Sequence, residues 1–322
     1  MRIKPVIFFT AGCLVFAGLA ARSQNIRRTG LRRSPESRSA NIYTWGTENT
    51  PAWVDKLHIF GYRIGCSASV AVCASEARNA ARQFGARRIN LAIPLDPTRE
   101  PADALKYSQA SLSNPFLAEV TFDDFVRLYG RLVARPGFSS PSWLAKVIHN
   151  VKAKNPSLRV GITLYENELD SADIRPPKLP SKVAAGINDV YLYLHYRADA
   201  PNYAAYVRRT KALFPNAKVI AGSYAYDRVN YLPCSPFNGR ACTPAQDVKL
   251  YEESIAIQAR LLKEGVLAGI EFYPGYFGKE SEWPGWKEGG RICRPNRVQQ
   301  CIDNTRTMRE YAAKALSSAL GW

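Results

Sequence analysis

The stretch Arg159-Val-Gly-Ile-Thr-Leu-Tyr-Glu-Asn-Glu-Leu-Asp170 is the best guide to the fold of this chain. Its apolar residues Val160, Ile162 and Leu164 alternate with a glycine, a threonine and a tyrosine, the period of two typical of a strand with two different faces. In an α/β protein the apolar face packs under helices and the other face points into the sheet's interior or a barrel lumen. This stretch therefore predicts a strand of a helix-covered sheet.

Three carboxylates, Glu166, Glu168 and Asp170, follow directly where this strand ends. The C-terminal ends of strands are where α/β barrel enzymes place their catalytic groups. A solvated polar turn is the alternative interpretation, because catalytic residues favour such loops without being confined to them.

The rest of the chain alternates between strand-like and helix-like segments. The strand-like segments are Ile42–Trp45, Leu57–Arg63, Arg88–Pro94, Arg159–Tyr165, Asp189–Tyr196, Lys218–Tyr224 and Leu267–Tyr273. Helices are expected over Ala74–Phe84, from Thr121, from Ser140-Pro141, over Tyr203–Phe214, from Thr243 to Gly265 and over Asn296–Leu316. Residues 97–120 are interpreted as a long loop, since they are rich in Pro, Ser and Asp.

This alternation predicts a parallel sheet covered by helices. Polar and aromatic residues on one parity of several strands, such as Tyr193, His195 and Glu271, indicate a lumen. We therefore expect a (β/α)8-type barrel, regular or irregular, in preference to a doubly wound sheet. The sequence contains neither a G-x-G-x-x-G after a first strand nor a P-loop, which also disfavours nucleotide-binding folds.

The N-terminus has the pattern of a secretory signal peptide. Arg2 and Lys4 precede an apolar run from Val6 to Ala20, which is too short for a comfortable membrane span. We expect cleavage after Ala21 or Ser23, and no later segment is apolar enough to span a bilayer. The expected organisation is a signal peptide over 1–23, a basic disordered leader over 24–40 and one barrel domain over 41–322.

The formal net charge of +17 is unevenly distributed, because residues 1–40 contribute +7 and the remainder +10. The leader could contact anionic polymers, although a soluble tether is the simpler role. No basic stripe with interleaved aromatic residues follows it, so nucleic acid is not an expected partner.

Six cysteines beyond Cys13 fall into three close pairs, which agrees with export into an oxidising compartment. Sequential local pairing is our hypothesis among the fifteen connectivities that six cysteines allow. Metal binding is disfavoured, because there is no Cys-x-x-Cys. The predicted disulfides are Cys66–Cys73, Cys234–Cys242 and Cys293–Cys301.

Polar residues near the predicted strand ends are the candidate site. Glu271 is the strongest candidate, because a Glu inside the apolar strand Gly269-Ile-Glu-Phe-Tyr273 is costly to bury unless it is paired or functional. A structural carboxylate bound to tyrosines or to an arginine is the alternative. The other candidates for substrate binding are Asp96, Asn167, Tyr193, His195, Tyr224, Tyr273 and the loop residue Trp283.

Two carboxylates across a cleft can break a glycosidic bond, one as proton donor and the other as nucleophile or base. Glu271 with either Glu166 or Glu168 is the predicted pair, and strand parity does not choose between the latter two. The Asn167-Glu168 pair resembles the Asn-Glu pair that ends the fourth strand in many retaining (β/α)8 glycoside hydrolases, whose second Glu ends a late strand. The resemblance covers two short segments and implies no single family.

Other chemistries have less support. The three histidines, His58, His149 and His195, lack a metal-ligand spacing such as H-E-x-x-H, and no G-x-S-x-G elbow is present. We expect no cofactor, with carboxylate-bound Ca²⁺ or Mg²⁺ left open. The sequence thus predicts a secreted, monomeric glycoside hydrolase with a carbohydrate substrate. The alternative is a non-catalytic carbohydrate-binding or cell-surface protein on the same barrel.

Overall fold

The computed structural model describes residues 41–45, 56–137, 140–225, 242–273 and 298–322. All of them belong to one compact unit that spans residues 40–322. The predicted signal peptide and basic leader lie outside the described residues and stay predictions.

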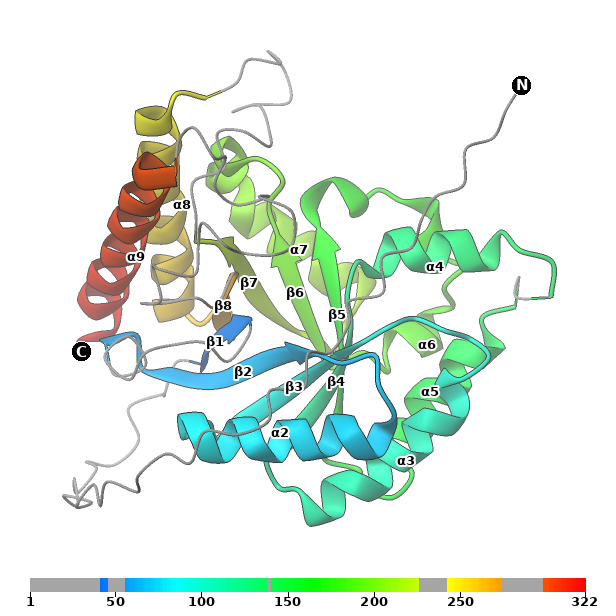
Figure 1. The fold of residues 1–322 in the computed structure, drawn as a ribbon. Helices are drawn as coiled ribbons and strands as arrows, with labels where there is room; N and C mark the ends of the chain where they lie inside the picture. Colours follow the sequence, from blue (N-terminus) through cyan, green and yellow to red (C-terminus); the bar gives the residue numbers. More distant parts are fainter. Residues whose placement is uncertain (1–40, 46–55, 138–139, 226–241, 274–297) are drawn as a thin grey trace, which may run out of the picture. The chain divides into compact units, whose positions relative to one another are not determined.

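Eight parallel strands close into a barrel in the order in which they occur in the chain, with β1 paired to both β2 and β8 (Figure 1). This confirms the predicted (β/α) barrel. The strands are β1 Asn41–Trp45, β2 Ile59–Gly65, β3 Arg88–Ile93, β4 Leu117–Phe122, β5 Arg159–Tyr165, β6 Asp189–Tyr193, β7 Lys218–Tyr224 and β8 Gly269–Tyr273.

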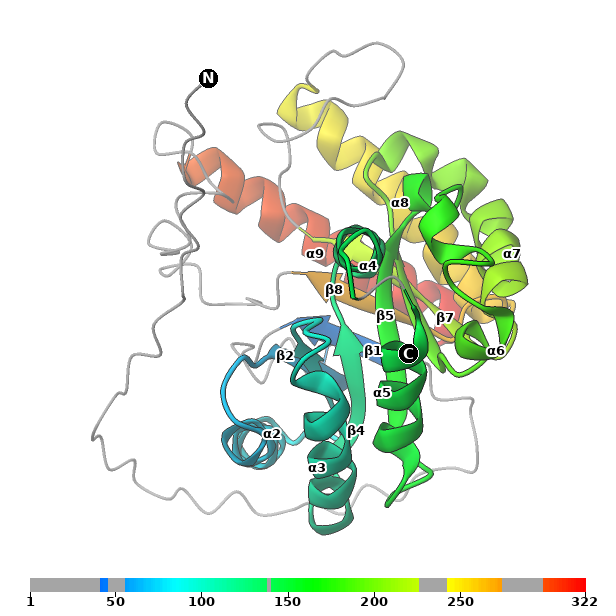
Figure 2. The same cartoon turned by 90° about the vertical axis from the view of Figure 1, so that its right-hand side faces the viewer.

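Helices surround the barrel. Helices α3 and α5 pack against each other beside β4 and β5, and α8 packs against α9 on another flank (Figures 1 and 2). The α-helices are α2 Val70–Phe84, α3 Glu100–Ser113, α4 Phe125–Val133, α5 Ser142–Lys152, α6 Ser181–Ala184, α7 Tyr203–Leu213, α8 Pro244–Lys263 and α9 Val298–Leu320. Three 3-10 turns, η1 Glu166–Glu168, η2 Ala172–Ile174 and η3 Arg197–Asn202, shape the segments after β5 and β6.

The two parities of β5 separate as the sequence predicts. Val160, Ile162 and Leu164 are buried in the main core between strands and helices. Tyr165 instead packs with a second apolar cluster, which contains Tyr43, Tyr191, Tyr193 and Ile220. Because Tyr191 and Tyr193 share one parity of β6, this second cluster is the filling of the barrel lumen.

The expectation of a loop over residues 97–120 was wrong, because this segment contains α3 and β4. The buried side of α3 includes the polar residues Glu100, Asp103, Ser108 and Ser111. The helix therefore lacks the purely apolar stripe by which a helix is recognised in a sequence. Strand β4 has Glu119 and Thr121 buried in place of apolar residues. Thr121, predicted as a helix cap, is therefore a strand residue, and α4 begins after Asp124.

Helix ends follow the local signals more closely. Gly85 ends α2 with a φ of 65°, a left-handed conformation that glycine adopts without strain. The Thr243 side chain accepts a hydrogen bond from the Gln246 backbone N–H, and the Gln246 side chain accepts one from the Thr243 N–H. This is the predicted capping box at the start of α8.

The disulfide Cys66–Cys73 is present, with an S–S distance of 2.05 Å. Cys242 and Cys301 are buried and take part in disulfides. Their predicted partners, Cys234 and Cys293, lie outside the described residues, so those two pairings stay predictions.

Among the helices that the structure describes, none combines the length and the apolar character that crossing a bilayer requires.

Candidate active site

Glu271 lies inside the barrel and is held from two sides. Its Oε1 is 2.9 Å from Nε of Arg63 on β2, and its Oε2 accepts a hydrogen bond of 2.6 Å from the Tyr193 hydroxyl on β6. Neither Glu271 nor Arg63 has any exposed surface. Burial raises the pKa of Glu271 to about 7, while Arg63 and the Tyr193 hydroxyl act in the opposite direction. The carboxyl is thus fixed in place, and burial raises its pKa above the usual range.

Arg63 organises this part of the lumen, although the sequence analysis did not single it out. Its Nη1 donates a hydrogen bond of 2.7 Å to Oγ1 of Thr163 and is 3.8 Å from Oδ1 of Asp123. Its guanidinium carbon lies 3.7 Å from the centre of the Tyr191 ring. Like Glu271, Arg63 is a charged residue inside an apolar strand, and this signal in the sequence identifies both residues.

Asp123 is the second carboxylate beside Arg63. It follows β4 directly, at the C-terminal end of the barrel, and its side chain is 46% exposed. We call Arg63, Asp123 and Glu271 the upper cluster. One guanidinium therefore serves two carboxyl groups, of which one is enclosed and the other reaches solvent.

The structure separates the roles of Glu166 and Glu168. Glu166 is 5% exposed, and its Oε2 accepts a hydrogen bond of 2.7 Å from the His195 backbone N–H. The same oxygen is 3.6 Å from Nδ1 of His195. Glu166 thereby fixes the segment after β6.

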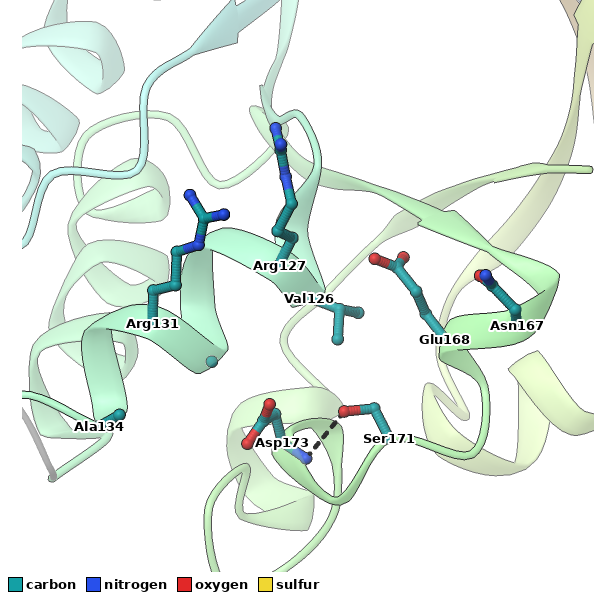
Figure 3. Close-up of a pocket in the computed structure, with 9 residues that line it drawn as sticks. Val126, Arg127, Arg131, Ala134, Asn167, Glu168, Ser171 and Asp173 are labelled. Atoms are coloured by element: carbon teal, nitrogen blue, oxygen red, sulfur yellow. Dashed lines mark hydrogen bonds between the residues drawn. The ribbon is translucent and has the colours of Figure 1, made fainter. Parts of the chain in front are cut away.

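Glu168 is half-buried, and its Oε2 accepts a hydrogen bond of 2.9 Å from the Tyr165 backbone N–H. Burial raises its pKa, partly offset by that hydrogen bond. With the exposed Asn167 it lines a pocket of about 470 Å³ against α4 (Figure 3). A carboxyl that borders a pocket and has a raised pKa is a candidate for general acid catalysis.

Aromatic rings surround the end of the lumen. The Tyr165 and Tyr224 hydroxyls are 2.8 Å apart, and the His195 ring lies 4.3 Å from that of Tyr165. Tyr273 packs edge-on against Tyr224 at 5.8 Å and against Trp45 at 5.9 Å. Four of the predicted site residues, Tyr193, His195, Tyr224 and Tyr273, are therefore linked by ring contacts, directly or through Tyr165.

Two predicted site residues are not part of this group. The Asp96 carboxylate accepts hydrogen bonds from the backbone N–H and hydroxyl of Thr98, so it shapes the turn that leads into α3. Trp283 lies outside the described residues.

A second ionic group fills the opposite part of the barrel. Nη2 of Arg88 is 2.6 Å from Glu119 and 3.1 Å from Asp189, and Arg159 holds Asp189 through a further ion pair. We call Arg88, Glu119, Arg159 and Asp189 the basal cluster, because three of the four residues begin their strands. The basal cluster was not predicted from the sequence, because its carboxylates come from the unrecognised strand β4 and from the first residue of β6.

The strand count bears on the resemblance to retaining glycoside hydrolases. Asn167-Glu168 follows β5, the fifth strand, whereas the pair ends the fourth strand in those enzymes. The pair followed the fourth strand-like segment in the sequence because β4 was not recognised there, and its true place after β5 departs from the pattern of those enzymes. Glu271 lies on β8, a late strand as the resemblance implies.

No protein-family model matches the chain, and no curated protein matches it in sequence. Glycoside hydrolases are among the solved structures of similar fold. A GH10 xylanase from Thermobacillus composti has a TM-score of 0.53 and 11% identity, over 86% of this chain and 96% of that one. The catalytic domain of a chitinase from Pyrococcus furiosus has a TM-score of 0.50 and 11% identity, over 88% and 97%.

An exo-beta-1,4-mannosidase from Opitutaceae bacterium strain TAV5 has a TM-score of 0.50 and 10% identity, over 85% of this chain. The match spans only 60% of that mannosidase. At these identities the likeness establishes the (β/α)8 barrel, and function must be argued from the site.

Proposed function

We propose that the protein is a secreted glycoside hydrolase that acts on a polysaccharide or glycoconjugate through two carboxyl groups at the C-terminal face of the barrel. The observation that carries this proposal is the position of Glu271, fixed in the lumen between Arg63 and the Tyr193 hydroxyl. The ion pair orients the carboxylate and stabilises its charge, as a nucleophile or second carboxylate requires.

Glu168 is the proposed acid/base. Its raised pKa favours the protonated form that donates to the leaving oxygen, and its place in the pocket gives it access to a ligand. Glu166 is the weaker choice, because its carboxylate is buried and occupied by the His195 backbone.

The rings at the end of the lumen are proposed to position the sugar. Tyr224 and Tyr273 are partly exposed and offer apolar faces on which sugar rings stack. His195, whose side chain is 30% exposed, would donate or accept a hydrogen bond. Asn167 would contact the substrate from the pocket, and Asp96 and Trp283 stay candidates from the sequence alone.

One observation favours the alternative of a non-catalytic carbohydrate-binding protein. Glu271 has no exposed surface and is paired with an arginine, which is also how a purely structural carboxylate is held. Such a protein would keep the aromatic rings and lack turnover.

Release of reducing ends from a panel of polysaccharides by the mature protein tests the proposal. Glu271→Gln and Glu168→Gln should each lower turnover by about a thousandfold or more, while Glu166→Gln should have a much smaller effect. Glu310→Gln on the exposed face of α9 is the control. Binding of a glycan without turnover by the unmodified protein would support the alternative instead.

Secretion is tested separately. N-terminal sequencing of the exported protein should give Arg22 or Gln24 as the first residue, in agreement with cleavage after Ala21 or Ser23. Peptide mapping without reduction should yield the two remaining local disulfides. Long-range links, or a retained leader, would contradict this part of the proposal.

A further inference from the structure

The pocket beside Glu168 has walls of different chemical character. Helix α4 contributes Arg127 and Arg131, and the segment after β5 contributes Asn167, Glu168, Ser171 and Asp173. Figure 3 shows both arginines extending from the same helix, with Glu168 pointing from the opposite wall toward α4. Its volume of about 470 Å³ is within the range of small-ligand pockets.

The two walls come close together at Gly130 of α4. A Cβ added there would lie 2.3 Å from Oδ2 of Asp173 on the 3-10 turn η2, so a larger residue would require the Asp173 side chain to shift. Helix α4 is anchored by the buried Phe125 and Tyr129, whose rings stack at 5.2 Å. The arginines therefore project from a fixed wall, one helical turn apart.

The pocket lining carries two arginines, Arg127 and Arg131, and two carboxyl groups, Glu168 and Asp173. Arg127 forms an ion pair with Asp124, and Asp173 is 2.6 Å from Nζ of Lys178. The exposed Arg131 has no ion pair or hydrogen bond within the part of the chain that the structure describes. Of the two arginines that line the pocket, Arg131 is therefore the one without an ion pair to any residue that the structure describes.

We propose that this pocket binds a carboxylate-bearing sugar, a uronic acid residue, with Arg131 as its principal contact and Arg127 as its second. The planar fork of a guanidinium matches a carboxylate in two parallel hydrogen bonds. Asn167 and Ser171 supply polar groups for the sugar hydroxyls. The net charge of +10 beyond residue 40 attracts such polyanions in general.

This inference rests on the proposed function only in placing the uronate next to the acid/base Glu168, which lines the same pocket as Arg131, whereas Glu271 is not among the lining residues. It refines the substrate class from any carbohydrate to an acidic glycan. Binding, which requires no turnover, tests it independently.

The probes are matched pairs of oligosaccharides prepared from pectate, alginate, hyaluronan and glucuronoxylan, each in its native and carboxyl-reduced form. Calorimetry with the mature full chain should show at least one native oligosaccharide binding about tenfold or more tightly than its reduced counterpart. Arg131→Gln should remove that preference by weakening the native member alone. Arg131→Lys should restore it only in part, because the charge remains while the fork is lost.

Arg82→Gln is the matched control, since Arg82 is an exposed arginine in the last turn of α2 and its loss changes the net charge equally. It should leave the preference unchanged. Equal affinity for native and reduced members of every pair, or unchanged affinity after Arg131→Gln, would overturn the inference. An Arg131-dependent preference without loss of turnover in Glu168→Gln would instead keep this inference and reject the proposed function.

Discussion

The basal and upper clusters are both built from arginines and carboxyl groups inside one barrel, yet they differ in the ratio of positive to negative groups. In the basal cluster two guanidiniums hold two carboxyl groups at the N-terminal ends of strands. In the upper cluster one guanidinium faces two carboxyl groups, and Asp123 reaches solvent. Tyr191 connects them, because its hydroxyl donates to Glu119 while its ring lies under Arg63. We infer that the first cluster serves stability and that the second retains capacity for a ligand.

The largest expected effect is the loss of folding stability when the basal cluster is broken. Asp189→Ala removes the carboxylate that Arg88 and Arg159 share and leaves two partly buried guanidiniums without it. The free energy of unfolding should fall by about 3–5 kcal/mol in urea denaturation followed by circular dichroism. Asp303→Ala, on the exposed surface of α9, should cost less than about 1 kcal/mol. Equal losses in the two variants would contradict a stabilising role.

A second test compares two lumen glycines. A Cβ on Gly161 would lie 1.9 Å from Oε1 of Glu119, and a Cβ on Gly222 would lie 2.2 Å from the Tyr193 ring. Each glycine-to-alanine change should therefore destabilise the fold by about 1–3 kcal/mol through overpacking. Only Gly222→Ala should also reduce turnover per folded molecule, since Tyr193 holds Glu271. A similar loss of turnover in Gly161→Ala would remove the functional distinction between the clusters.

The smallest effect concerns pH. Tyr193→Phe removes a donor that stabilises the charged form of Glu271, so the pKa of Glu271 should rise from its value of about 7. If Glu271 acts as a carboxylate, activity is lost as pH falls through that pKa. The acidic limb of kcat/KM should then move to higher pH, by about one unit. Tyr191→Phe, which affects the basal cluster, should leave this limb in place.

Local sequence signals were sufficient for most of the barrel. The apolar alternation of β5 identified its two faces, and the Thr243 capping box located α8, because both depend on residues close together in the chain. They failed for α3 and β4, whose buried faces carry Glu100 and Glu119. Burial of such groups is decided by partners from other elements, which a local pattern does not contain.

The sequence alone determined the alternation of strands and helices and the unusual position of Glu271 inside an apolar strand. Only the tertiary structure decided that Arg63 and Tyr193 hold Glu271, and that Glu168 rather than Glu166 faces a pocket. The physical reason is barrel closure. It brings β2, β6 and β8 around one lumen, whereas periodicity reports only which way a side chain points and not what it meets there.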